Sequence, residues 1–524
     1  MEKLTIAALL GALLLVSAGF YFLPEPSPPH SPPLQLIPPS EPKLSPDIIG
    51  SLNATLSSHG GKVLTPEHPD FAEFTTPWEP KCLDRPYVVF AAATEEDTAA
   101  VLREINKAGE RFSIMSGGHD SECQSTTKHV LLTNKLLKKV TVDTQSRTIA
   151  VQAGARWKEV YAKLNNTGYL VVGGSCPTVG VSGFTLGGGF NWFLSRYYGI
   201  AAENTLALKA VLASGELVTV TWDNEYSDLA WGLLGSGGQQ LAMVLEFTYR
   251  IHPADTYTVL KLNYLFTDDG TATSYPVQQF KRVFKRWVHS VQELEDNSAV
   301  GGVTIEANRD ETKGLGVRRY EMSVFGVCRG CDWGEFIKGT VQRFPPTFYD
   351  SVKSSASFQE FQASFAFLDH YPAAVSTDRP CAFLSHLNDD TTDALVDFFA
   401  PDTREEGDTV DTGVHIEAIM IKGAVKDPIH TSLGPAKVSW KLHAAFKIPS
   451  QADIKHGDAV TGRWNKEIMK AAGSDYLGGY INYFDMSLGK KHYYGDNLKK
   501  LKKIKAKYDP ENRFQRAKGI SQKK

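Results

Sequence analysis

The sequence is poor in cysteine and carries little net charge, and each shortage excludes a class of protein. Six cysteines in 524 residues are too few for a disulfide scaffold. The 56 basic and 59 acidic residues leave a formal net charge of −3, so no overall positive field attracts nucleic acid. Hydrophobic residues make up 42% and charged residues 22%, which excludes a disordered, a collagen-like or a polytopic membrane chain. A globular protein of two to four domains remains, at about 100–200 residues per domain.

One long stretch, Leu4 to Leu23, is apolar and uncharged. It predicts either a cleaved secretory signal, with Val16-Ser17-Ala18 as the cleavage site, or an anchor whose length would span about 30 Å of membrane. Residues 1–23 are therefore assigned to a signal peptide or signal anchor. Both alternatives send the rest of the chain into the secretory pathway, either secreted or membrane-anchored with its folded part lumenal or extracellular.

Proline is concentrated in one place, because ten of the 27 lie between residues 24 and 46. Such a segment favours extended polyproline II and predicts a stalk or linker over residues 24–47. Two acceptor sequons follow, at Asn53 and Asn165. In a lumenal chain they are predicted glycosylation sites on surface loops.

The pattern after the stalk predicts an α+β fold. β-forming residues at 86–90 and 111–115 flank a helix that Thr94 caps and Gly109 ends. Further strands are expected at 130–134, 140–143 and 148–154, and further helices at 157–165, 276–293, 391–399 and 497–508. Alternating strands between about 257 and 473 indicate an antiparallel sheet in a second domain.

The last predicted helix has a clear apolar side. Leu498, Leu501, Ile504 and Tyr508 share one face, and lysines occupy the others. A basic patch for lipid or nucleic acid is one interpretation of these lysines. A solvated helix face is the simpler one, and we predict it.

Glycine is clustered in three loops, which read SGGHD from Ser116, GGSCPTVGVSGFTLGGG from Gly173 and GSGG from Gly235. Glycines let backbone N–H groups approach a ligand closely, often an anionic phosphate. Three such loops between strands indicate a large nucleotide cofactor, the alternative being three tight turns. The GxGxxG fingerprint and the Walker pattern are absent, which argues against a Rossmann or P-loop site.

These motifs, in this order, resemble those of the berberine-bridge-enzyme-like family of FAD-linked oxidases, within the vanillyl-alcohol-oxidase, or PCMH-type, flavoprotein superfamily. The resemblance includes YGIAAENTLALKAVLASGELV, SDLAWGLLGSGGQQLAMV and the C-terminal YINYFD, YYGDN and KIKAKYDPENRF. It implies a two-domain PCMH-type FAD-binding fold. Residues 48–255 would bind FAD, residues 256–470 would form a substrate-binding domain on an antiparallel sheet, and residues 471–518 would return to the FAD-binding domain.

The resemblance implies that FAD is held covalently through His119 and Cys176, which match the residues that bond the flavin 8α-methyl and C6. A hydrogen-bonded turn residue at 119 and a buried or disulfide-bonded thiol at 176 are the alternatives. Other matching positions are expected to contact the pyrophosphate, to let the chain pass close to the cofactor or to contact the flavin. They are Ser116, Gly117, Gly118, Thr178, Val179, Gly180, Gly183, Gly188, Gly189, Val244 and Asn482.

Tyr483 matches the tyrosine that acts as catalytic base in many relatives. A phenol has a pKa near 10, so a working base needs that value lowered or a coupled proton acceptor. On a strand, Asp485 would share a face with Tyr483 and could flank it, with Tyr480 nearby. A half-buried strand aromatic is the alternative for Tyr483, and His443 is a substitute base.

Three departures from the family pattern stand near these motifs. Met115 replaces an arginine, Phe184 replaces a histidine, and LGSGGQQLA replaces an arginine-glycine loop. The lost charge and imidazole should weaken polar contacts near the flavin and put full oxidase activity in doubt. They leave the fold unaffected.

The remaining cysteines are Cys82, Cys123, Cys328, Cys331 and Cys381. Cys328 and Cys331 form a CxxC motif that could bind metal or do redox exchange. Without a second pair, and in a secretory chain, a local disulfide is favoured and no metal site is predicted.

The leading hypothesis is an FAD-linked oxidase in which a base removes a proton, a hydride passes to the flavin and O₂ reoxidises it. Its substrate would be a small molecule, an alcohol, amine or phenolic of secondary metabolism, with an oligosaccharide as the alternative. Two further hypotheses are a flavoprotein cyclase without net oxidation and an inactive binding protein. We expect a monomer, with membrane anchoring only through residues 4–23.

Overall fold

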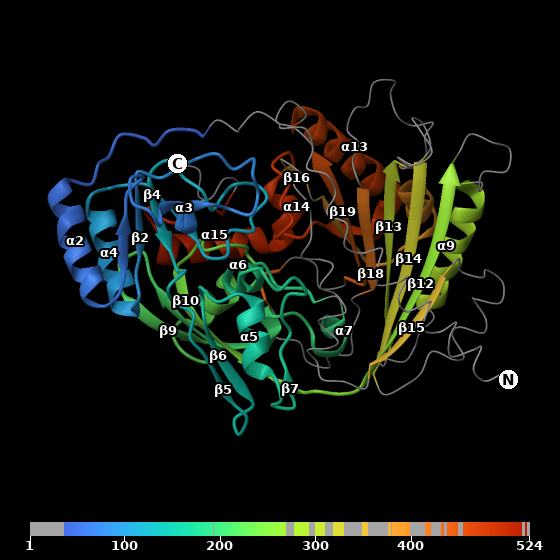
Figure 1. Ribbon diagram of the computed structural model, residues 1–524, viewed down its shortest axis with the longest axis horizontal. Coiled ribbons are helices and arrows are strands. Elements are labelled where there is room, and N and C mark those ends of the chain that lie inside the picture. Colours follow the sequence, from blue (N-terminus) through green and yellow to red (C-terminus); the bar gives the residue numbers. More distant parts are fainter. Residues whose placement is uncertain are drawn as a thin grey trace, which may run out of the picture. The chain divides into compact units, whose positions relative to one another are not determined.

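The computed structural model describes the chain from Leu36 to Ile520, apart from residue 192 and residues 269–276, 293–298, 310–317, 330–347, 355–375, 379, 399–413, 421–430, 434–437, 449–453 and 516–518. From Leu36 on, the chain forms one unit built on three large sheets (Figure 1). No helix of the described residues is long and apolar enough to cross a membrane. Leu4 to Leu23, the predicted signal or anchor, lies outside them.

A four-stranded sheet begins the fold. Its order is β1 (Lys62–Leu64), β2 (Val88–Ala91), β4 (Val130–Thr133) and β3 (Phe112–Met115), with β4 parallel to both β2 and β3. Helices α2 (Pro46–Ser58), α3 (Phe71–Thr75) and α4 (Glu95–Lys107) belong to this part. The Thr94 side chain accepts a hydrogen bond from the Asp97 N–H at the start of α4, and Gly109 adopts a positive φ just after its end. The predicted strand–helix–strand unit is confirmed.

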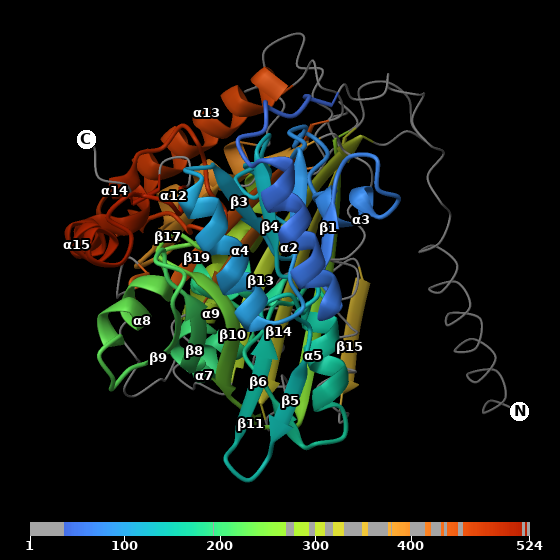
Figure 2. The same ribbon diagram turned by 90° about the vertical axis from the view of Figure 1, so that its left-hand side faces the viewer.

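A five-stranded antiparallel sheet follows (Figure 2). Its order is β5 (Val140–Asp143), β6 (Thr148–Gln152), β10 (Met243–Arg250), β8 (Thr205–Val211) and β9 (Leu217–Thr221). Around it lie α5 (Trp157–Leu164), α6 (Val181–Leu186), α7 (Leu194–Tyr198), α8 (Ser227–Leu233) and the short pair β7 (Tyr169–Leu170) and β11 (His252–Pro253). The fully buried Trp157, at the start of α5, anchors a core cluster under this sheet.

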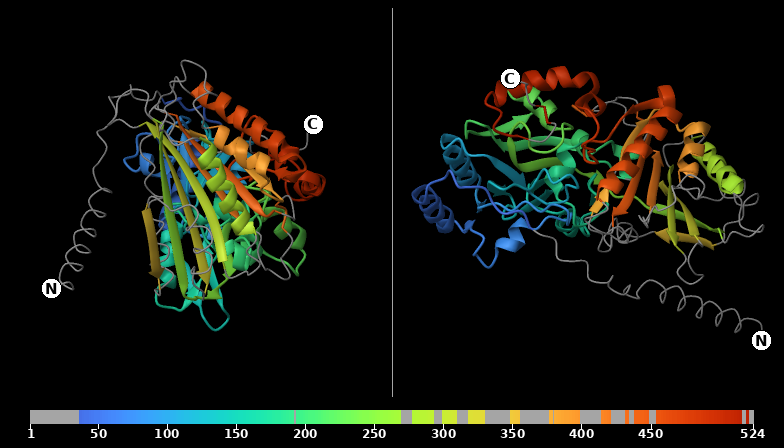
Figure 3. Two further views of the ribbon diagram at one scale, coloured as in Figure 1. Left: turned by 90° about the vertical axis from the view of Figure 1, so that its right-hand side faces the viewer. Right: turned by 90° about the horizontal axis from the view of Figure 1, so that it is seen from above.

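A nine-stranded antiparallel sheet makes up the second half. Its order is β15 (Phe348–Ser354), β12 (Tyr257–Asp268), β14 (Arg318–Arg329), β13 (Ala299–Arg309), β18 (Val414–Met420), β19 (Trp440–Ile448), β17 (Cys381–Leu384) and β20 (Tyr476–Gly478), with β16 (Ser376–Asp378) also paired to β19. Helices α9 (Val277–Gln292), α12 (Asp389–Asp397) and α13 (Ile454–Ala472) cover one face, as the left view of Figure 3 shows. The predicted antiparallel sheet with helices is confirmed, although α13 was not predicted.

The end of the predicted stalk is part of the folded structure. Ile37 donates its N–H to the Leu83 carbonyl, and Ser40 bonds the Lys128 carbonyl. Leu44 is buried in the core cluster that also contains α4 residues. Ile37, Ser40 and Leu44 therefore all contact the folded domain. The boundary of the linker at residue 47 stays a prediction.

The C-terminal helix α15 (Leu498–Tyr508) buries Leu501, Ile504 and Tyr508, as predicted. The prediction that its lysines are solvated is wrong for Lys505. The Lys505 Nζ is buried, pairs with Asp509 at 2.6 Å and donates to the carbonyls of Gln240 and Phe514. A lysine can take a buried position when such partners satisfy its ammonium group. Helix α14 (Lys490–Tyr494) precedes it.

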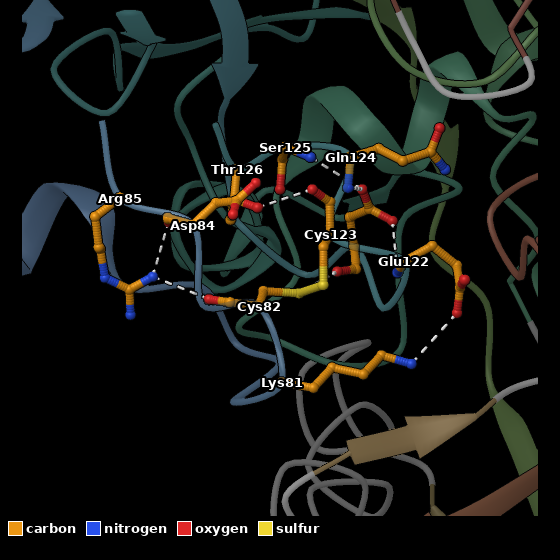
Figure 4. The surroundings of a disulfide bond; sticks show 10 residues. Lys81, Cys82, Asp84, Arg85, Glu122, Cys123, Gln124, Ser125 and Thr126 are labelled. Atoms are coloured by element: carbon orange, nitrogen blue, oxygen red, sulfur yellow. Dashed lines mark hydrogen bonds and ion pairs between the residues drawn. A yellow bond between two sulfur atoms is a disulfide. The ribbon is translucent and has the colours of Figure 1, made fainter. Parts of the chain in front are cut away.

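Cys82 and Cys123 form a disulfide, a pairing that the sequence left open (Figure 4). Cys328 is also disulfide-bonded. Its predicted partner, Cys331, lies outside the described residues. Cys176 and Cys381 are not in disulfides, which removes the disulfide alternative for Cys176.

Candidate active site

A cavity of about 290 Å³ lies where the first two glycine loops meet the start of β19 and the chain after β20. Ten of the residues expected at the cofactor or in catalysis line it: Ser116, Gly117, Gly118, His119, Cys176, Val179, Gly180, Gly183, Asn482 and Tyr483. The fold thus brings together two stretches of chain that are separated by almost three hundred residues. Thr178, Gly188, Gly189 and Val244 do not line this cavity.

Two glycines allow the first two loops to touch. A Cβ at Gly117 would lie 2.6 Å from the Cα of Gly180, and a Cβ at Gly180 would lie 2.7 Å from the Cα of Gly117. Real side chains do not tolerate such distances, so both positions need glycine for the loops to pack together. The result is a backbone cradle on the cavity wall, and its lining fits the pyrophosphate of a dinucleotide such as FAD.

Gln239, directly after the third glycine loop, links the first two loops to strand β10. The Gln239 Oε1 accepts the Val244 N–H at 2.9 Å, which turns the amide nitrogen toward the hydroxyls of Ser116 and Ser182, at 3.4 and 3.3 Å. The Asn134 amide in turn donates to the Val244 carbonyl at 3.2 Å. Both backbone groups of Val244 are therefore engaged inside the protein. Ser182 lies in the stretch from Thr178 to Gly183 that was expected around the pyrophosphate. Sequence reasoning missed Gln239, whose only signal was a polar residue directly after the third glycine loop.

Two further glycines of the second loop, Gly188 and Gly189, have positive φ angles and pack against the protein. Gly188 has φ +109° and lies against Leu433, and Gly189 has φ +77° with Phe184 2.6 Å from where its Cβ would be. In the third loop, the N–H groups of Gly235 and Gly237 both donate to the Leu186 carbonyl at the end of α6. In the structure, these glycines shape turns beside the cavity.

Each of the two predicted attachment residues has a close neighbour. The imidazole of His119 stacks on the Trp78 indole, with ring centroids 4.5 Å apart. The Cys176 sulfur lies 3.2 Å from the Thr178 hydroxyl. Thr178 therefore lies next to Cys176 and outside the cavity lining.

The segment after β20 is a turn, so the prediction that Tyr483 lies on a strand is wrong. Strand β20 ends at Gly478, and the Tyr483 N–H donates to the Tyr480 carbonyl at 2.9 Å. Two side chains tie the turn to the second glycine loop. The Tyr480 hydroxyl accepts the Gly189 N–H, and the Asn482 amide donates to the Phe184 carbonyl at 2.9 Å.

The absence of a side chain at Gly187 makes room for Asn482. A Cβ at Gly187 would overlap the Asn482 amide. The amide nitrogen also donates to the Tyr480 hydroxyl at 3.0 Å. Burial raises the pKa of Tyr480 well above its ordinary value. Tyr480 therefore remains a protonated phenol that positions the turn.

Asp485 does not flank Tyr483, contrary to the prediction. Its carboxylate accepts hydrogen bonds from the Asn465 amide and the Ser487 N–H, and it lies outside the cavity lining. Because the chain turns at 481–483, the two-residue periodicity of a strand does not apply there.

Two basic residues of β19, Lys441 and His443, lie against Tyr483 instead of Asp485. They are two positions apart on the strand, so both side chains point to the same face and reach the cavity, and both are at least 95% buried. The His443 ring stacks on the Tyr483 ring, with centroids 4.2 Å apart and planes 13° from parallel. The Lys441 Nζ lies 4.9 Å from the Tyr483 ring centroid.

The departures from the family pattern fall in two environments. Met115 is fully buried in a small core cluster beneath the first glycine loop. Phe184 lines the cavity and packs edge-on against Trp157, with centroids 5.1 Å apart. Met115 therefore changes the packing beneath the first glycine loop, and Phe184 makes the cavity wall more apolar.

Both predicted glycan acceptors are exposed. Asn53 lies on α2, so the expectation of a loop is wrong there. Asn165 follows the end of α5 in an exposed turn.

Two family models match this chain, an FAD binding domain over residues 86–221 and a berberine and berberine-like model over residues 479–521. The chain is 27% identical over 477 residues to a VAO-type flavoprotein oxidase of Thermothelomyces thermophilus, covering 84% of this chain and 77% of that protein. It is 24% identical over 493 residues to a carbohydrate oxidase of Microdochium nivale, covering 89% of this chain and 94% of that protein.

The fold is similar to that of a glucooligosaccharide oxidase of Acremonium strictum, whose FAD is 6-S-cysteinyl and 8α-N1-histidyl. The TM-score is 0.73 and the identity 20%, over 90% of this chain and 99% of that one. At this identity the likeness concerns the fold alone. It confirms the predicted PCMH-type α+β architecture.

Proposed function

Because this chain belongs to the berberine-bridge-enzyme-like family of FAD-linked oxidoreductases, we propose that it is an oxidase that moves a hydride from a small organic substrate to FAD, with O₂ as final acceptor. The observation that carries this proposal is the position of Tyr483. It lies against Lys441 and His443 on the wall of the cavity that His119 and Cys176 also line.

FAD supplies a two-electron acceptor that O₂ can reoxidise. This chain would hold it through His119 and Cys176, covalently at both. The Gly117–Gly180 cradle, with the hydroxyls of Ser116 and Ser182, would bind the pyrophosphate. Both attachment side chains line one cavity and belong to loops that touch each other, which supports this assignment.

In the proposed mechanism, the Tyr483 oxygen accepts the substrate proton. The positive charge of Lys441 near the ring favours the phenolate, and stacking on His443 fixes the ring plane. Asn482, held by the Phe184 carbonyl, would contact the flavin from the same turn. His443 is the alternative base, because it also lines the cavity.

For the substrate we propose an alcohol, amine or phenolic compound of secondary metabolism. Phe184 and Phe190 line the cavity and give it apolar walls that suit an aromatic molecule. The second candidate is an oligosaccharide, which the similarity to the Microdochium nivale carbohydrate oxidase favours. Two further candidates are a cyclase without net oxidation and an inactive binding protein, and the experiment below distinguishes them from an oxidase.

We further propose that residues 1–23 direct the protein into the secretory pathway, where Asn53 and Asn165 are exposed for glycosylation. Whether 1–23 are cleaved or anchor the chain, and whether it is a monomer, stay predictions. Mass spectrometry of the secreted protein would identify its first residue and its glycans.

The decisive experiment follows the colour of the purified protein. It should be yellow, and the colour should stay with the pellet after acid precipitation. The single variants His119→Ala and Cys176→Ala should each keep flavin by one bond, and the double variant should release it. Bleaching of the flavin in a substrate screen, with H₂O₂ release, then identifies the oxidase. A colourless protein would contradict the proposal, and turnover without H₂O₂ would favour the cyclase.

A further inference from the structure

Trp78 lies against the predicted attachment residue. Its indole is stacked on the His119 imidazole, with the planes 15° from parallel and the centroids 4.5 Å apart. The backbone N–H of Trp78 donates to the Gly118 carbonyl at 2.9 Å, so a hydrogen bond also joins the Trp78 segment to the first glycine loop. Both side chains line the cavity.

Trp78 is not a core residue. It is half-buried, and the hydrophobic clusters found among the described residues do not include it. Other half-buried tryptophans, such as Trp231, pack against such a cluster. The main described contact of the Trp78 ring is therefore with a side chain at the site.

The segment that carries Trp78 is clamped to the loop that carries His119. The Cys82–Cys123 disulfide joins the two, and Figure 4 shows the Lys81–Glu122 ion pair beside it, at 3.4 Å. Both charged side chains of this pair are at least 80% buried. The disulfide and the ion pair therefore fix the segment of Trp78 relative to the loop of His119.

The backbone after His119 is fixed as well. The Asp120 carboxylate accepts hydrogen bonds from the N–H groups of Glu122, Gln124 and Ser125. With the backbone fixed, the orientation of the imidazole depends on its two side-chain torsions. A flat aromatic neighbour restricts both of them.

We propose that Trp78 is a positioning residue that orients the His119 imidazole for covalent attachment of FAD. The inference rests on the proposed function, in which His119 bonds the 8α carbon. Overall, one imidazole nitrogen replaces one hydrogen of the 8α-methyl group, and two protons and two electrons pass to O₂ as H₂O₂. Bond formation of this kind requires a near-attack orientation, which the stack supplies.

The test uses Cys176→Ala as background, so that His119 provides the single remaining link. The full chain is produced without flavin, FAD is added, and acid-stable flavin is followed over time. Trp78→Leu, which keeps apolar volume without a ring, should slow attachment at least about tenfold. Reversible FAD binding and the melting temperature should stay unchanged. Trp78→Phe, which keeps a stacking ring, should restore most of the rate.

Trp231→Leu is the control, because it makes the same change at another half-buried tryptophan that lies outside the cavity lining. Its attachment rate should equal that of the background. An unchanged rate in Trp78→Leu would overturn the inference, as would equal slowing in Trp78→Leu and Trp78→Phe. Failure of the proposed function looks different, because the Cys176→Ala background would then release all its flavin in acid.

Discussion

The imidazole of His443 lies flat against the phenol ring of Tyr483, with ring centroids 4.2 Å apart. His443 belongs to a strand of the nine-stranded sheet, and Tyr483 belongs to the turn tied to the second glycine loop. This contact therefore joins the predicted substrate side of the molecule to its cofactor side. It brings a titratable pair to the cavity wall, with the Lys441 ammonium beside it.

Replacing Tyr483 by phenylalanine should remove the base and keep the stack. Because the ring remains against His443, the flavin spectrum and melting temperature should stay unchanged. The rate of flavin reduction should fall by about 10²–10⁴-fold, the usual contribution of a general base. Anaerobic stopped-flow bleaching with a substrate from the screen measures it.

Tyr480→Phe is the matched control for that variant. It leaves the buried Gly189 N–H without its acceptor, so it should lower the free energy of unfolding by about 1–3 kcal/mol. Its effect on flavin reduction should be smaller than that of Tyr483→Phe. If Tyr483→Phe reduces flavin at a near-normal rate while His443→Gln does not, His443 is the base.

Lys441→Met should slow flavin reduction. The Lys441 Nζ lies 4.9 Å from the Tyr483 ring centroid, where a cation attracts the ring and its oxygen. The rate measured by anaerobic flavin bleaching should fall by about tenfold. Lys441→Arg keeps the charge and should retain most of the rate. An unchanged rate in Lys441→Met would mean that Lys441 does not act on the base.

Local signals in the sequence were sufficient for the elements around the site. The Thr94 cap, the Gly109 stop and the apolar face of α15 all predicted structure correctly, because each depends on neighbours within a few residues. The register of β19 against β18 depends on residues distant in the sequence, and so does the turn at 481–483, which bonds to Phe184 and Gly189 of the second glycine loop. Period-two reasoning therefore chose Asp485 as the partner of Tyr483, whereas the fold supplies Lys441.

The glycine loops illustrate the same limit. Their composition predicted a cofactor site, but it did not separate glycines that face the cavity from glycines that pack on protein. Gly117 and Gly180 do both, because they contact each other and line the cavity. Gly189 packs against Phe184, a contact that no spacing rule contains.

Stability should fall as the pH drops from about 6.5 to 4, in part through His492. Burial lowers the pKa of His492 to about 4, below the ordinary 6.5. In that window the unfolded chain binds a proton that the folded chain does not, so acid favours unfolding. His492→Gln should remove this part of the pH dependence, about 2–3 kcal/mol.

Chemical unfolding at pH 7 and pH 4.5 measures this difference. His68→Gln is the control, because His68 is exposed. His252, whose pKa burial also lowers to about 4, should still contribute in the His492 variant. A pH dependence in His492→Gln equal to that of the unchanged protein would contradict the assignment.

Two glycine substitutions should separate loop packing from cofactor binding. Gly117→Ala places a Cβ 2.6 Å from the Gly180 Cα, so it should lower both the melting temperature and FAD content. Gly183 lines the cavity and, outside its own helix and its chain neighbours, no atom lies within 4 Å of its Cβ position. Gly183→Ala should therefore reduce FAD content without lowering the melting temperature of the flavin-free chain.

Gly50→Ala, in α2 and with nothing within 4 Å, controls for the methyl group itself. It should change neither quantity beyond the gain of up to about 1 kcal/mol expected when alanine replaces a helical glycine. Flavin absorbance per protein and thermal unfolding before and after adding FAD give both readouts. Full FAD content in Gly183→Ala would mean that the cofactor does not pass this stretch of the second loop, and the predicted contact at Gly183 would be wrong. Because the flavin-free Gly183 variant keeps its fold, such a result would bear on the binding path alone.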